Sequence, residues 1–172
     1  MDIEASAISR YKTLPLIPLR GISVFPGMML TFEVERPVTI AAVNAAMESD
    51  QTAFLVSQRD TALELPTGED SLFKIGTVCR IRQVMRIPEE NSARVMVEGV
   101  SRAYLTRIVK KRPYFAAHIE LIETAPDPRS AVKAEALIRQ CYGLFEEYAQ
   151  AVGADARDIM KNIMDSDDPG YV

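Results

Sequence analysis

Ile75-Gly-Thr-Val-Cys-Arg-Ile-Arg-Gln-Val-Met-Arg-Ile87 alternates between two sets of side chains over its whole length. One face would carry Ile75, Thr77, Cys79, Ile81, Gln83, Met85 and Ile87, and the other Val78, Arg80, Arg82, Val84 and Arg86. This period of two predicts a half-buried β-strand with one solvated face. The turn residues Pro88-Glu-Glu-Asn91, followed by alternating Val95 and Val97, predict a return strand that completes a hairpin.

Two more strands are expected directly after this hairpin. One covers Ala103 to Val109, after a break at Gly99, and the other covers Phe115 to Leu121, after Pro113. A meander of four strands leaves two edges exposed to solvent. We therefore expect it to close into a small barrel, or to be covered by the flanking segments.

The residues before the meander predict strands and one short helix. The expected elements are a strand over 14–19, a loop over 20–27, a strand over 28–35, a helix opened by Arg36-Pro37, a strand over 52–57 and an acidic loop over 60–71. Strand 14–19 contains two prolines, which cannot donate to a ladder, so it should lie at an edge or enter at a bulge. Ile40, Val43 and Met47 would form the buried side of the helix.

The hydrophobic period changes after Thr124. Asp127 is a suitable N-cap and Pro128 a suitable first helical residue, and Gly153 should end this helix. Its apolar stripe would consist of Ala134, Leu137, Ile138, Cys141, Leu144, Phe145, Tyr148 and Val152. A second helix is expected from Asp155. The fold class is therefore α+β, with a β domain over 1–124 and the start of a helical subdomain over 125–172.

The last residues, Asp165-Ser-Asp-Asp-Pro-Gly170, read as the beginning of a further helix. We therefore expect the chain to be part of a longer protein. No run approaches the roughly 18 apolar residues of a membrane span, and the first residues lack the basic region of a signal peptide. These features predict a cytoplasmic protein without membrane contact. Cys79 and Cys141 are expected to be buried, reduced thiols rather than parts of a disulfide framework.

The charge is unevenly distributed along the chain. The formal net charge is −4, yet residues 80–112 hold nine Lys and Arg against three Glu, a local charge of +6. Such a segment can bind nucleic acid. However, arginines that alternate with aliphatic residues are typical of the solvated face of an antiparallel strand, and no aromatic residue interleaves with Arg80, Arg82 and Arg86 to stack bases. Nucleic acid is therefore the less favoured partner.

A search for catalytic or metal-binding groups yields none. The chain has a single histidine, His118, on the polar face of an expected strand, where a lone histidine is far more often a surface residue than a catalyst. One histidine with two cysteines gives no metal-ligand spacing. None of the eight glycines belongs to a phosphate-binding motif. Composition alone does not exclude a Ser/Lys dyad. The sequence thus predicts a binding or scaffolding unit with no catalytic residues, metal or cofactor of its own.

Methionines near two turns indicate where such a unit could bind. Met28 and Met29 follow a Pro-Gly turn and Met85 precedes the hairpin turn. Thioether side chains adapt to varied apolar partners, although they also fill cores. If the loop over 20–27 packs over the hairpin's end, Phe25, Pro26, Met28 and Met85 would form one exposed apolar patch.

Six segments, in this order, resemble one known family. They are Leu14-Pro-Leu-Ile-Pro-Leu-Arg20, Val24-Phe-Pro-Gly27, Glu35-Arg36, Phe54-Leu-Val-Ser-Gln-Arg-Asp60, Leu72-Phe-Lys-Ile-Gly-Thr-Val78 and Val95-Met-Val-Glu-Gly-Val-Ser-Arg-Ala103. Together they resemble the N-terminal domain of the ATP-dependent Lon protease of the LonA type. The segment at 165–170 is similar to the family's signature at a helix start.

The resemblance implies a PUA-like β-barrel with a short helix, followed by a helical extension. It also implies recognition of unfolded or damaged proteins and support of a homohexamer. The AAA+ ATPase, with its ATP and Mg²⁺, and the Ser/Lys protease would lie outside residues 1–172. Pro26, Met28 and Met85 would match the family's substrate-contacting surface. A PUA-like RNA-binding module and a stand-alone adaptor with this domain remain the alternatives, since a shared fold is weak support for function.

Overall fold

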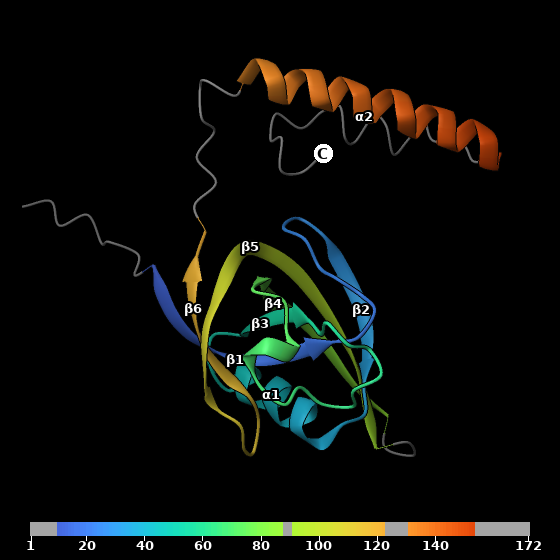
Figure 1. The fold of residues 1–172 in the computed structure, drawn as a ribbon. Helices are drawn as coiled ribbons and strands as arrows, with labels where there is room; N and C mark the ends of the chain where they lie inside the picture. The colour runs from blue at the N-terminus through green and yellow to red at the C-terminus, as the bar shows by residue number, and fades with distance from the viewer. Residues whose placement is uncertain (1–9, 88–90, 123–130, 154–172) are drawn as a thin grey trace, which may run out of the picture. The chain divides into compact units, whose positions relative to one another are not determined.

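The computed structural model describes residues 10–87, 91–122 and 131–153. The chain divides into two compact units after Glu123, and each is described by itself. The first unit contains, in order, β1 (Tyr11–Leu19), β2 (Met29–Val34), α1 (Pro37–Met47), β3 (Thr52–Ser57), the 3-10 turn η1 (Glu69–Ser71), β4 (Ile75–Ile87), β5 (Ser92–Lys110) and β6 (Ala116–Leu121) (Figure 1). Of the second unit, the structure describes α2 (Ala131–Val152) with Gly153.

The first unit is a small β-barrel. Its six-stranded sheet has the order β2-β5-β4-β3-β1-β6, and an additional β5–β6 pairing closes the sheet. All neighbouring strands are antiparallel except β1 and β3. β2 lies outside the closed ring, as a sixth strand paired to the first half of β5. The predicted α+β class and the predicted closure are confirmed.

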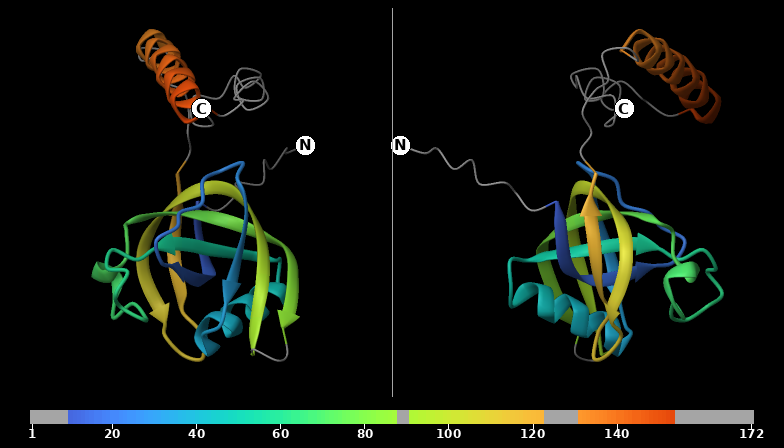
Figure 2. Two further views of the ribbon diagram at one scale, coloured as in Figure 1. Left: turned by 90° about the vertical axis from the view of Figure 1, so that its right-hand side faces the viewer. Right: turned by 60° about the vertical axis from the view of Figure 1, so that its left-hand side comes forward.

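One long strand replaces the two that were expected between Ser92 and Val109. β5 runs for 19 residues, so the predicted break at Gly99 is wrong. Gly99 pairs with Cys79 and Ser101 pairs with Val78, which leaves Val100 as an extra, bulged residue. A bulge bends a strand and increases its twist. β5 can therefore pair with β2 in its first half, pair with β6 in its second half, and curve around the barrel between them (Figure 2).

β1 is not the edge strand that its prolines suggested, because it lies between β3 and β6. Residues 11–15 pair with β6, whereas residues 16–19 pair with β3. Each half of the strand thus forms a ladder on one side only. Pro15 and Pro18 lack a backbone N–H. They are tolerated because only one edge of β1 is paired at each of these positions.

The core consists of two clusters on opposite faces of β3. Ala53 and Leu55 belong to one cluster with the buried residues of α1, and Phe54 and Val56 belong to the other with the buried residues of β6. All four side chains are at most 2% exposed. This burial on both faces explains why β3 reads as a continuous apolar run rather than an alternating one.

α1 begins at the predicted proline and covers one of these clusters. Its buried residues are Thr39, Ala42, Val43 and Ala46. Ile40 packs partly against the same cluster, but Met47 is 39% exposed, so its predicted core position is wrong. The small residues let the helix lie close to the sheet, and Met47 is left at the end of the last turn.

α2 ends where the sequence predicted, since Gly153 has a positive φ of 69° that favours glycine after a helix. Its predicted apolar stripe is only partly buried. Leu137, Leu144 and Tyr148 are exposed, and Cys141 is exposed rather than buried, in contrast to buried Cys79. The expected caps at 127–128 and the second helix lie outside the described residues. Within the described part, no helix is long and apolar enough to cross a membrane.

Candidate functional site

The loop over residues 20–28 is fixed to the middle of β5 at a glycine. The amide of Gly27 donates to the carbonyl of Gly99 at 2.9 Å, and the amide of Gly99 donates to the carbonyl of Met28 at 2.9 Å. A Cβ atom added at Gly99 would stand 2.1 Å from the carbonyl oxygen of Phe25. Only a residue without a side chain lets the loop cross β5 this closely. The two segments Val24–Gly27 and Val95–Ala103 are therefore in direct contact.

A second contact holds the base of the loop. Val24 is buried in the core, and its carbonyl accepts a hydrogen bond from Thr77 Oγ1 at 2.6 Å. The loop's tip is left in solvent, because Phe25 is 54% exposed and Met28 38% exposed, with Pro26 half-buried between them. The Arg102 guanidinium lies over the Phe25 ring, 5.7 Å from its centre. The loop thus presents an apolar tip on a rigid base.

Met85 reaches the surface because a bulge reverses the faces of β4. Ile81 pairs with Val97 and Gln83 with Met96, which leaves Arg82 as an extra residue. Before the bulge, odd-numbered side chains of β4 face the core, and after it even-numbered side chains do. Val84 therefore packs on the core, whereas Met85 is 46% exposed. The single continuous face predicted for β4 is wrong. Two consecutive polar residues, Arg82-Gln83, were the signal in the sequence.

The structure does not bring Met85 next to the loop tip. Met85 pairs with Arg94, whereas Gly99 marks the position where the loop crosses β5. Five residues of extended strand separate these positions on β5, or about 16 Å. Phe25, Pro26 and Met28 therefore form one exposed group, here called the loop tip, and Met85 lies near the opposite end of the hairpin. The substrate-binding role of Pro26, Met28 and Met85 stays a prediction.

Two further methionines lie between these positions. Met29 pairs with Glu98, Thr31 with Met96, and Met96 in turn with Gln83. The side chains of Met29, Met96 and Met85 consequently follow a diagonal over the outer face of β2, β5 and β4, here called the methionine diagonal. Met29 is 52% exposed and Met96 is half-buried. The sequence pattern missed Met96, because β2 becomes a neighbour of Met96 only through long-range pairing.

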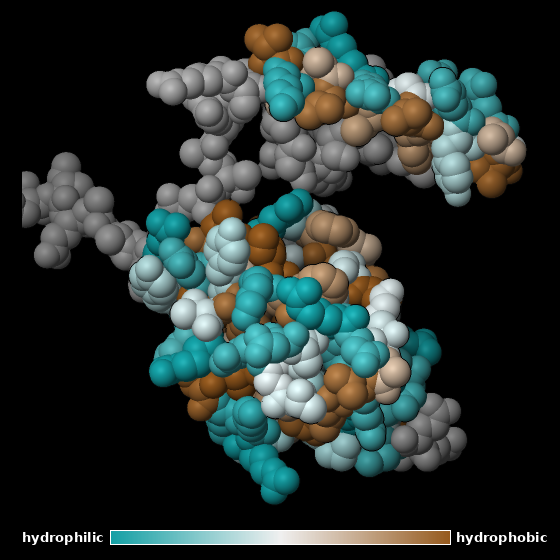
Figure 3. Space-filling model, in the orientation of Figure 1, coloured by the Kyte–Doolittle hydropathy of each residue, from teal (hydrophilic) through white to brown (hydrophobic). Residues whose placement is uncertain are grey.

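Several cations of the segment 80–112 have partners inside the chain. Arg82 Nε donates to Glu98 Oε2 at 2.6 Å, and Arg86 Nη2 donates to Asn44 Oδ1 at 3.1 Å. Lys110 lies over the ring of Tyr114, with its Nζ 4.0 Å from the ring centre. Part of the charge of this segment is therefore held in local contacts. The face of the barrel seen in Figure 3 intersperses hydrophilic with apolar residues.

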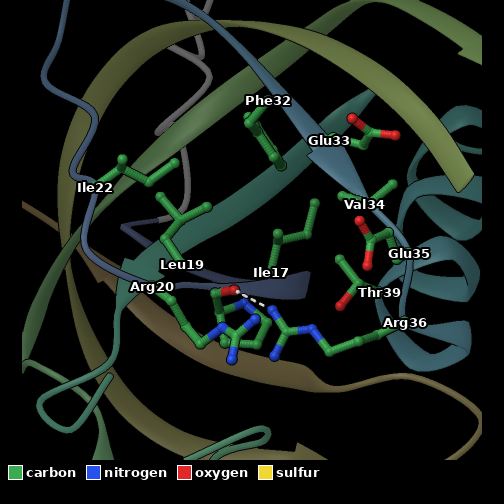
Figure 4. A pocket seen from close by; sticks show the side chains of 11 residues that line it. Ile17, Leu19, Arg20, Ile22, Phe32, Glu33, Val34, Glu35, Arg36 and Thr39 are labelled. Atoms are coloured by element: carbon green, nitrogen blue, oxygen red, sulfur yellow. Dashed lines mark hydrogen bonds between the residues drawn. The ribbon is translucent and has the colours of Figure 1, made fainter. Parts of the chain in front are cut away.

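A cleft of about 200 Å³ lies between the end of β1 and the second half of β2. Ile17, Leu19 and Phe32 point toward one another across it, and the guanidinium groups of Arg20 and Arg36 lie side by side at its rim (Figure 4). A second cleft, of about 390 Å³, lies between α1 and the hairpin's end near Arg86.

Arg36 fixes the wall of the first cleft. Its Nη2 donates to the carbonyl of Pro18 at 3.2 Å, and its Nη1 donates to the carbonyl of Glu64. Burial, followed by the nearby charge of Arg20, lowers the pKa of Arg36 below its usual value. An arginine stays charged even so. Arg36 therefore ties α1 to β1 and to the loop after β3.

The thiol of Cys79 and the imidazole of His118 lie on different strands of the barrel, β4 and β6. Burial raises the pKa of the Cys79 thiol to about 12, so that it stays protonated at neutral pH. His118 is hydrogen-bonded through Nδ1 to Thr13 Oγ1 at 2.6 Å, on the outside of the barrel. No group of three or more His, Cys, Asp or Glu side chains suited to a metal occurs within residues 10–87, 91–122 and 131–153.

Comparison with known proteins identifies the family. The family model described as the ATP-dependent protease La (LON) substrate-binding domain matches residues 13–172. The chain belongs to this Lon family. The match covers the barrel from the third residue of β1 onward, including the loop tip and the methionine diagonal.

Several Lon proteases are similar to this chain in sequence. Lon protease of Clostridium acetobutylicum is 38% identical over 159 residues, and that of Clostridioides difficile strain 630 is 35% identical over 158 residues. Lon protease 1 of Bacillus subtilis strain 168 is 32% identical over 159 residues. These alignments cover 90–92% of the chain but 20% of each relative. The chain thus spans about a fifth of the length of the Lon proteases that it matches.

Two solved Lon structures share the fold. The N-terminal domain of Mycobacterium avium complex Lon protease superposes with a TM-score of 0.67 at 24% identity, covering 92% of this chain and 78% of that one. The Lon N-terminal domain protein from Xanthomonas campestris gives a TM-score of 0.52 at 18% identity, with 92% of both chains covered. At these identities the superpositions support the barrel fold alone.

Proposed function

We propose that this chain is the substrate receptor of an ATP-dependent Lon protease and that it binds unfolded, damaged or short-lived regulatory proteins. Other parts of such a protein would supply the AAA+ ATPase, with its ATP and Mg²⁺, and the Ser/Lys endopeptidase. The chain itself binds without cleaving. The parent would act as a homohexamer in the cytoplasm.

The match to the substrate-binding domain family over residues 13–172 carries this proposal. The surface supports it, because the loop tip and the methionine diagonal expose flexible apolar side chains on a rigid barrel. Such side chains can repack around many different apolar sequences. That property suits a receptor whose partners share exposed hydrophobic residues rather than a common motif.

We expect the chain to bind a denatured casein-type protein with micromolar or weaker affinity. A few apolar contacts must offset the entropy lost when a mobile partner becomes ordered, so tight binding is excluded. Fluorescence anisotropy of the labelled partner measures the affinity, with a stably folded protein of similar size as the control. Equal binding of both partners would contradict the proposal. So would strong RNA binding that weakens steeply with salt, because phosphate contacts produce that dependence.

Replacing Met28 and Met85 together by serine should weaken this binding several-fold and leave the fold intact. Both side chains lie at the surface and are partly exposed, so the expected change in unfolding free energy is below about 1 kcal/mol. The two single variants show which end of the hairpin contacts the partner. Met47→Ser is the matched control, because Met47 is 39% exposed and Met28 38% exposed, but Met47 lies on α1. Unchanged binding in the double variant would place the contact surface elsewhere.

A further inference from the structure

β2 has one unpaired edge. The strand stands at the end of the sheet order and, within the described residues, pairs with β5 alone. The amide of Gly99 donates to the carbonyl of Met28, which is one of the two bonds of a hydrogen-bonded pair, while the amide of Met28 donates to the Phe25 carbonyl at 3.1 Å. In an antiparallel ladder such pairs recur at every second residue. The backbone N–H and C=O groups of Met29, Thr31 and Glu33 therefore point away from β5, toward the unpaired edge.

The sequence of this edge lacks two of the usual protections. β2 reads Met-Leu-Thr-Phe-Glu-Val, six residues without proline or lysine. Natural proteins generally block such edges with proline, lysine, bulges or a covering segment, because an unblocked strand pairs with other chains. An edge left open in this way is suited to pairing with a partner.

The 200 Å³ cleft lies directly beside this edge. Its lining residues come from 17–22 on one side and from 32–36 on the other, so it follows the second half of β2 (Figure 4). Leu19, Ile22 and Phe32 give it apolar walls. A strand added to β2 would direct every second side chain toward this cleft and the others toward the outer face.

The polar groups of the cleft favour an uncharged occupant. Its lining residues include two arginines, Arg20 and Arg36, and two glutamates, Glu33 and Glu35, a formal net charge of zero. The Glu33 carboxylate is directed to Ser92, whose Oγ donates to Glu33 Oε1 at 2.7 Å. Thr39 lines the cleft and is 2% exposed, and its Oγ1 has no hydrogen-bond partner among the described residues.

We infer that an extended, uncharged, apolar segment of an unfolded polypeptide binds by adding a strand to the unpaired edge of β2. Its alternate side chains enter the cleft, and the remaining ones lie beside Met29 on the methionine diagonal. The inference rests on the proposed function and specifies its mode of recognition. Backbone hydrogen bonds are common to all sequences, so strand addition suits a receptor for many different partners.

The first test removes one edge donor. Thr31→Pro deletes an N–H that does not bond β5, and proline is tolerated at the solvent side of an edge strand. Thr31→Val is the matched control, since it keeps the N–H and changes the side chain. We expect Thr31→Pro to bind the casein-type protein about tenfold more weakly, through the lost hydrogen bond and the ring's obstruction. Thr31→Val should bind within about twofold of the unchanged chain.

The second test leaves the protein unchanged, and it decides the question if Thr31→Pro does not fold. An uncharged peptide of alternating valine and threonine is compared with two N-methylated forms. Methyl groups on two adjacent central amides block both edges of the peptide strand and should abolish binding. The same groups at the terminal residues should leave binding within about threefold. Hydrogen exchange at the amides of Thr31 and Glu33 should slow when the peptide binds.

The outcomes separate the inference from the proposed function. If the chain binds neither the casein-type protein nor the peptide, the proposed function fails. If it binds them but Thr31→Pro, central methylation and amide exchange have no effect, strand addition is wrong and the receptor function stands. If the free chain is a dimer in which the amides of Thr31 and Glu33 are already protected, a second copy occupies the edge and the inference is overturned.

Discussion

Gly99→Ala is expected to destabilise the barrel by about 3 kcal/mol, because the new methyl group would overlap the backbone of the loop. The added Cβ would lie 2.1 Å from the Phe25 carbonyl oxygen and 2.9 Å from its carbonyl carbon. A backbone cannot yield as the end of a side chain can. The loop must move away, and the loop tip moves with it. Urea unfolding followed by circular dichroism measures the loss.

Gly68→Ala is the control for this substitution. A Cβ at Gly68 has no heavy atom within 4 Å, and its φ of −174° is ordinary extended backbone. We expect a change of less than about 0.5 kcal/mol there. Similar stabilities for Gly99→Ala and Gly68→Ala would show that the loop does not lie on β5 as described. If Gly99→Ala folds, weakened binding of the casein-type protein would also connect the loop's position to function.

Phe54→Ala should cost about 4 kcal/mol of unfolding free energy, since it empties the centre of one core cluster. Phe54 is fully buried, and its ring lies against Gly76 of β4, where an added Cβ would be 2.6 Å from the ring. Gly76 has no side chain that could move into the space left by the ring. Equilibrium unfolding in urea is again the measurement, and the slope with denaturant should stay constant if the variant remains two-state.

Phe73→Ala provides the comparison with the same change of residue at the surface. Phe73 is 45% exposed, with the Arg59 guanidinium 4.9 Å from its ring centre. Loss of this contact should cost about 1 kcal/mol. Equal costs at Phe54 and Phe73 would contradict the assignment of Phe54 to the core.

Local patterns in the sequence predicted the elements that depend on nearby residues. β3 was expected with its observed bounds, because an apolar run bounded by polar residues defines a buried strand. The proline at the start of α1 and Gly153 at the end of α2 act through their own backbone conformations. These features need no information from distant parts of the chain.

Features that depend on pairing between distant strands were not predictable in the same way. The bulges at Arg82 and Val100 exist because β4 and β5 must curve around a barrel, and they decide which way Met85 points. The open edge of β2 likewise follows from the order of the strands. The sequence left open whether Met28 and Met85 lie at the surface or in the core, and the single patch that it offered for them is not formed. Their common role in binding remains to be measured.

The position of β1 between β3 and β6 also affects how the chain folds while the ribosome synthesises it. The first strand of the barrel pairs along residues 11–15 with β6, the last strand to be made. Until Leu121 has left the exit tunnel, this half of β1 has no partner, and the nascent barrel stays open. Closure thus joins residues more than a hundred positions apart, as the pairing of Tyr11 with Glu120 requires. Such distant pairing makes folding slow, so we expect barrel closure to be the late step for each newly made chain.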